Sequence, residues 1–99
     1  MNRFILFPKD TSIFRSRCPT SGSVKFLFRS SHPVNVIICE SSETDPQNAK
    51  KKYIFNNYLC INNTLSIPEQ WKNIAAHVIN PSQTDKVMCE YEFKFVKKV

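Results

Sequence analysis

The sequence predicts an all-β protein, a small antiparallel β-sandwich of the jelly-roll or immunoglobulin-like kind with about seven to eight strands. Two stretches, 23–29 and 87–96, alternate between apolar and polar residues with a period of two. A third stretch, 34–39, is apolar at every position except Asn35 and is typical of a central strand. The length of 99 residues corresponds to one domain, so we expect residues 1–99 to form a single unit.

Further strands are expected on both sides of these three. Two short apolar pieces, 3–7 and 12–15, are separated by Pro8-Lys9-Asp10 near the N-terminus. The polar segment Ser30-Ser31-His32-Pro33 predicts a turn, so strands 23–29 and 34–39 are expected to form a hairpin. Another strand is expected within 52–60.

The stretch 40–51 is the main polar insertion. It is polar almost throughout, with acidic residues first and lysines last. Loops of this kind on a small rigid scaffold often carry binding function. We therefore treat the loop as a candidate contact surface.

Residues 66–79 fit two structures. Ser66-Ile67-Pro68-Glu69 resembles a capping box, which would start a helix over about 67–79 and make the fold α+β. The alternative is a strand over 71–80 that forms a hairpin with 87–96. We favour the strand because the final strand needs a partner. Ile74, Ala76 and Val78 would then face the core, and Ala75 and His77 would face outward or sideways.

Composition excludes several classes of function. The single glycine, Gly22, is incompatible with the glycine-rich phosphate loops of nucleotide-binding enzymes. No apolar stretch approaches the length of a membrane-spanning helix. The apolar piece near the N-terminus is too short for a secretory signal. We therefore expect an intracellular protein, cytoplasmic or nuclear, with secretion as the alternative if a leader has been removed.

The four cysteines, Cys18, Cys39, Cys60 and Cys89, contain no closely spaced pair, so zinc-ribbon and thioredoxin patterns are absent. We interpret them as buried thiols of a reduced protein. The alternative is a secreted binding domain held by disulfides, for which sequence cannot choose a connectivity.

The net charge of +6 predicts an acidic partner. We expect the two termini to lie together and form one basic face. The candidate partner-binding residues are Lys50, Lys51, Lys52, Arg15, Arg17, Lys94, Lys97 and Lys98. Phenylalanines interleave with basic residues near the N-terminus, so binding of single-stranded nucleic acid or of another anionic surface is an alternative.

Catalytic patterns are weak. Cys89 and His77 would approach each other only if their two strands form a hairpin. Glu90 and Glu92 share a strand face, which is more typical of a solvated surface than of paired catalytic acids. We predict no enzyme activity, no cofactor and no metal site.

One resemblance adds to this interpretation. The strand, polar turn and strand of 24–38 are similar to the opening of small jelly-roll domains. Ile67-Pro68-Glu69-Gln70-Trp71, Val78-Ile79-Asn80-Pro81-Ser82 and the closing Tyr91-Glu92-Phe93 resemble the last hairpin of GOLD-type β-sandwiches. This resemblance implies a non-enzymatic interaction module.

Together these observations predict a protein-binding module without catalysis. It would bind through a sheet edge, through loop 40–51 or through the basic face. The strand at 3–7 is the segment expected to pair, within this chain or with a second copy as a homodimer.

Overall fold

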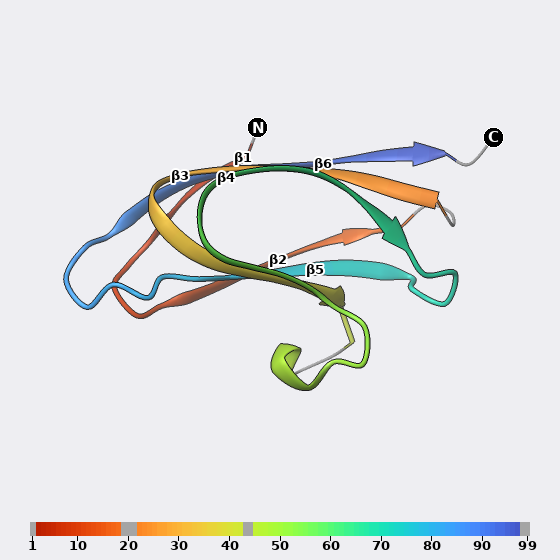
Figure 1. The fold of residues 1–99 in the computed structure, drawn as a ribbon, viewed down its shortest axis with the longest axis horizontal. Helices are drawn as coiled ribbons and strands as arrows, with labels where there is room; N and C mark the ends of the chain where they lie inside the picture. Colours follow the sequence, from red (N-terminus) through yellow and green to blue (C-terminus); the bar gives the residue numbers. More distant parts are fainter. Residues whose placement is uncertain (1, 19–21, 43–44, 98–99) are drawn as a thin grey trace.

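The computed structural model describes residues 2–18, 22–42 and 45–97. These hold six strands and one short 3₁₀ turn (Figure 1), which are β1 (Asn2–Leu6), β2 (Thr11–Arg17), β3 (Gly22–Glu40), η1 (Pro46–Asn48), β4 (Tyr53–Ile67), β5 (Asn73–Ile79) and β6 (Val87–Lys97). The predicted all-β class is confirmed. The structure has a strand, β5, in the region where the alternative helix of 67–79 was considered.

All six strands belong to one antiparallel sheet that curls strongly. The first part of β3 pairs with β6, and its second part pairs with β5. Along its other side β3 pairs with β4. The edge strand β1 pairs with β6, and β2 pairs with β5. The curl brings two halves face to face: a β6 half (β1, β6, β3, β4) and a β5 half (β2, β5, β3, β4).

The hairpin predicted between 23–29 and 34–39 is wrong, because β3 runs through Ser30 to Pro33 without turning back. The strand bends there, and its register with β4 shifts between Arg29 and Val34 and again before Val36. On β4 the bend is matched by Asn57, a residue that tolerates its positive φ of 63°. Long strands that serve both halves explain why six strands occur where about seven to eight were expected.

The predicted hairpin of β5 with β6 is also wrong. β3 separates the two strands, and β5 and β6 lie in opposite halves. The connection between them is anchored by Asn80, which is fully buried. Its Nδ2 donates to the carbonyls of Leu6, Phe7 and Asp85 at 3.2, 3.2 and 2.8 Å, and its Oδ1 accepts from the Ser82 amide at 3.0 Å. These bonds tie the connection to the end of β1.

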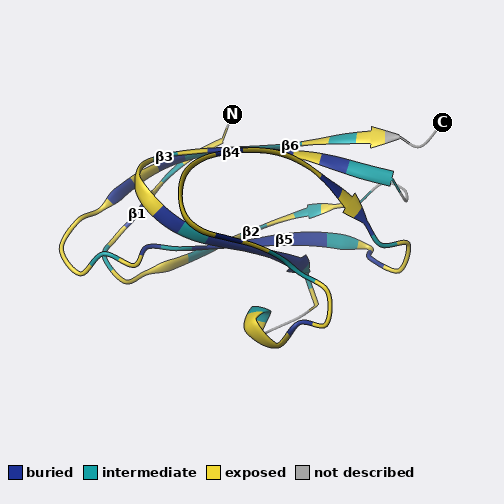
Figure 2. Cartoon of the chain, in the orientation of Figure 1, coloured by how far each residue is buried: buried dark blue, intermediate teal, exposed yellow. Residues whose placement is uncertain are grey.

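The core lies between the two halves and is rich in aromatic rings (Figure 2). Phe26 and Phe28 are completely or almost completely buried at its centre. Phe14 of β2 stacks on Tyr91 of β6 with ring centroids 3.5 Å apart, and it lies 5.8 Å from Phe4 of β1. Rings from the two halves therefore close the margin formed by β1 and β2, which we call the β1/β2 margin.

β5 is buried on both faces. Ala75 and His77 were expected to face outward in solvent, but they are only 1% and 4% exposed. On the outer face of the β5 half, the register places Ile54, Ile37, His77 and Ile13 in one row across four strands. Apolar neighbours on both sides explain why His77 is buried there.

Candidate functional site

Three strands, β1, β2 and β4, have an edge that pairs with no other strand among the described residues. β1 and β2 are five and seven residues long, and both carry arginine. β4 is 15 residues long and contains no charged residue, no proline and no glycine. Because charge, proline and shortness are what protects natural sheet edges from pairing, β4 is the unprotected edge of this sheet.

β4 is also exposed along much of its length (Figure 2). Its exposed apolar side chains are those of Ile54, Tyr58 and Leu59. The side chains that face the core, including Ile61 and Leu65, remain buried at 3% and 6% exposure. The strand therefore has a stable inner face, and its outer backbone edge can accept hydrogen bonds from another strand.

The curl of β4 brings its two ends together. The hydroxyl of Tyr53, its first residue, donates to the carbonyl of Ser66 near its end. We call the free edge of β4 the β4 margin. Lys50, Lys51 and Lys52 immediately precede Tyr53, so they lie at the end of the β4 margin where the two ends of the strand meet. Lys52 donates to the Gln47 carbonyl of η1 and is thereby held back toward the loop.

Lys50 and Lys51 are exposed, and neither makes an ion pair within the part of the chain that the structure describes. They line a shallow hollow of about 320 Å³ together with Glu40, Ala49 and Trp71. The side chain and amide of Ser42 donate hydrogen bonds to the Glu40 carboxylate and lower its pKa. This end of the β4 margin combines two exposed lysines with a fixed acid.

The other predicted basic residues are interspersed with acidic ones, since Arg15 lines a hollow together with Glu92 of β6. Arg15 and Arg17 are exposed on β2 in the β5 half, whereas Lys94 is exposed on β6 in the β6 half. Lys94 lies 3.9 Å from Glu92, so acidic residues are interspersed. Lys97 ends β6, and Lys98 lies outside the described residues. β1 pairs with only the first half of β6, so Asn2 lies opposite Tyr91, six residues before Lys97 along that strand.

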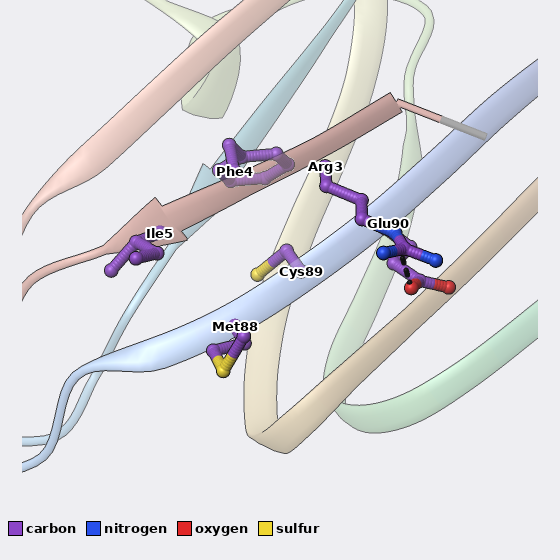
Figure 3. A pocket seen from close by; sticks show the side chains of 6 residues that line it. All are labelled: Arg3, Phe4, Ile5, Met88, Cys89 and Glu90. Atoms are coloured by element: carbon purple, nitrogen blue, oxygen red, sulfur yellow. Dashed lines mark ion pairs between the residues drawn. The ribbon is translucent and has the colours of Figure 1, made fainter.

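A second hollow, of about 500 Å³, lies where β1 pairs with β6 (Figure 3). Its lining residues are Arg3, Phe4, Ile5, Met88, Cys89 and Glu90. Arg3 Nε lies 2.9 Å from Glu90 Oε1, so the cation at this edge is already paired. The exposed side chains of Ile5 and Met88 make the rest of the opening apolar. The ion pair and the shortness of β1 make this edge a weaker template than β4.

Cys89 and His77 are not arranged as a nucleophile and its base. Cys89 lies in the β6 half and His77 in the β5 half, on strands separated by β3. Burial raises the pKa of the Cys89 thiol to about 11, which disfavours the thiolate. Burial, with a smaller effect of Arg15, lowers the pKa of His77. No group of three or more His, Cys, Asp or Glu side chains suited to a metal ion occurs among residues 2–18, 22–42 and 45–97.

Cys18, Cys60 and Cys89 are free thiols, and the four cysteines lie in very different surroundings. Cys39 and Cys89 are buried as expected, whereas Cys18 is half-buried and Cys60 is exposed near the middle of β4. Exposure of Cys60 was not foreseen, since it follows two large apolar residues. Those residues, Tyr58 and Leu59, are themselves exposed because β4 is an edge.

Sequence reasoning missed β4 as the candidate edge. It ended this strand at residue 60. Its expectation that segment 3–7 pairs within this chain or with a second copy is confirmed within the chain, because β1 pairs with β6. A usable signal was present: between Lys52 and Glu69 the sequence contains no charged residue.

Comparison with known proteins gives no family for this chain. No protein-family model matches the sequence, and no curated protein matches it. No helix in the described residues has the length and apolar character needed to cross a membrane.

Proposed function

We propose that this chain is a non-catalytic protein-binding module that adds an extended segment of its partner to the β4 edge. The observation that carries the proposal is that the longest free edge of the sheet carries none of the charge or proline that normally opposes strand addition, and that its bend lies before residues 60–67. Backbone hydrogen bonds would supply affinity, and side-chain contacts with exposed Ile54 and Leu59 would supply selectivity.

An acidic partner is part of this proposal. Lys50 and Lys51 stand at one end of the margin, exposed and without ion pairs among the described side chains. Acidic groups flanking the added segment would meet them, chiefly raising the association rate and its salt dependence.

We do not extend the proposal to nucleic acid. Stacking of bases requires exposed aromatic faces. Phe26 and Phe28 are buried in the core, and Phe4 and Phe14 pack against it, which leaves Phe7 as the one exposed ring among those interleaved with the basic residues. A single ring does not provide the successive platforms on which neighbouring bases stack.

Selection from a random-peptide display library tests the proposal. The selected peptides should bind the natural chain and lose at least about tenfold in affinity for a variant with Ile54→Lys and Asn63→Lys, because charge on an edge opposes pairing. The matched control, Met88→Lys with Val96→Lys, adds the same charge to exposed sites of β6, away from the β4 edge. Peptides that bind both variants equally would contradict the proposal.

A further inference from the structure

We propose that the β4 edge in the β6 half pairs with the same edge of a second copy of this chain, antiparallel and with Asn63 on the two-fold axis. This inference rests on the proposed function, because it uses the same β4 edge, and it adds self-association to the binding of an acidic partner. The pairing would join two β6 halves into one continuous sheet.

The first support is the symmetry of the β4 sequence about Asn63. Residues at equal distances on either side have the same chemical character. The pairs are Leu59 with Ile67, Cys60 with Ser66, Ile61 with Leu65, and Asn62 with Thr64. In a two-fold antiparallel pair each residue lies opposite its counterpart from the other copy, so such a strand complements itself.

The second support is that this register agrees with the faces of the sheet. Ile61 and Leu65 are buried beneath the sheet, and they would lie opposite each other on that side. Asn62 and Thr64 are exposed on the outer face and would also meet. A slip of one residue would place apolar side chains opposite outward polar ones, which disfavours it.

The third support is Asn63 itself. It pairs with Phe26 of β3 and so belongs to the face that carries the core, yet it is exposed. Its amide makes no hydrogen bond to any described residue. An asparagine amide has both donors and an acceptor, so two copies facing each other on the axis can bond to one another.

The fourth support is local geometry. The segment 60–67 pairs residue by residue with Gly22–Arg29, without a register shift, and the bend of β4 lies before it. This segment is also free of charge, so two copies do not repel each other. By contrast, Arg15 and Arg17 would bring like charges close together in a self-paired β2 edge.

Cross-linking at one designed position tests the register. In the proposed pairing, position 66 lies opposite Cys60 of the second copy, so Ser66→Cys brings two thiols within the Cα separation of a disulfide. Oxidation with diamide, which takes up the two thiol hydrogens, should give a covalent dimer whose bond joins positions 60 and 66. The control Thr64→Cys leaves its thiol diagonal to Cys60, at about 7–8 Å, and should cross-link far less.

Three outcomes would overturn the inference. Efficient cross-linking of Thr64→Cys, or of the natural chain through Cys60 alone, would mean a different register. A natural chain that stays monomeric in sedimentation at about 1 mM would mean no dimer. A dimer whose dissociation constant rises less than about tenfold in Asn63→Lys, which places like charges on the axis, would mean that another surface associates.

The same variants separate this inference from the proposed function. A monomeric chain whose selected peptides still respond to Ile54→Lys with Asn63→Lys would leave edge binding standing without self-pairing. Selected peptides that bind equally well with and without those substitutions would contradict edge binding, and they would contradict the proposed dimer register as well.

Discussion

The two margins of the curled sheet differ in how they end. At the β1/β2 margin both edge strands are short and carry arginine, and the rings of Phe4, Phe14 and Tyr91 close the space between the halves. At the opposite margin β4 leaves 15 uncharged residues with a free backbone edge. Ring contacts at the β1/β2 margin stabilise the fold. The outer backbone edge of β4 pairs with no other strand among the described residues.

This contrast predicts that substitutions at the β1/β2 margin change stability, whereas those at the β4 edge change association. The largest effect is expected for Asn80→Ala. Removing this buried amide leaves the carbonyls of Leu6, Phe7 and Asp85 without their donor, which should cost about 2–4 kcal/mol of unfolding free energy. Urea denaturation measures it. A loss below about 1 kcal/mol would mean that this connection does not anchor β1.

Phe14→Ala should have the next largest effect. It removes the ring that stacks on Tyr91 and contacts Phe4, and we expect a loss of about 2–3 kcal/mol. Edge affinity measured with a selected peptide should be unchanged at a temperature where the variant is folded. Equal stability of variant and natural chain would show that the rings do not seal this margin.

Asn63→Lys should behave in the opposite way. Its side chain is exposed and makes no hydrogen bond to any described residue, so the unfolding free energy should change by less than about 0.5 kcal/mol. Association should weaken in the same sample. Thermal denaturation and sedimentation measured on the same sample test this. A large loss of unfolding free energy would contradict the expected difference between the β1/β2 margin and the β4 edge.

The smallest effect concerns pH and arises in the β5 half. Burial lowers the pKa of His77 in the folded state from the ordinary 6.5, so the unfolded chain takes up a proton first as the pH falls. Stability should therefore be constant above about pH 7 and decrease as the pH drops below 6.5. The nearby positive charge of Arg15 also lowers the pKa of His77. His77→Gln should reduce this pH dependence, whereas His32→Gln, at an exposed site, should leave it intact.

Sequence alone predicts much of the secondary structure but little of the topology. The alternation of Val87, Cys89, Tyr91, Phe93 and Phe95 identifies β6 because a half-buried strand needs that period. Ser30 to Pro33 has the composition of a turn, but the long partner β4 holds this segment within β3. Local residue preferences carry no information about such long-range pairing.

The candidate site was less predictable than the strands. Clustering of basic residues in sequence suggested one basic face, but Glu92 lies beside both Lys94 and Arg15 at the β1/β2 margin. An edge strand is defined by a missing neighbour, which depends on the whole topology. Only the absence of charge between Lys52 and Glu69 pointed to β4 beforehand.

Amide hydrogen exchange at two protein concentrations tests the central claim most directly. At about 10 µM the amides of β4 that point away from β3 should exchange with solvent, and at about 1 mM those within 60–67 should become protected. Protection should be confined to this segment, and Asn63→Lys should remove it. Protection that instead appears on β1 or β2, or no change at any strand, would contradict the assignment of β4 as the binding edge.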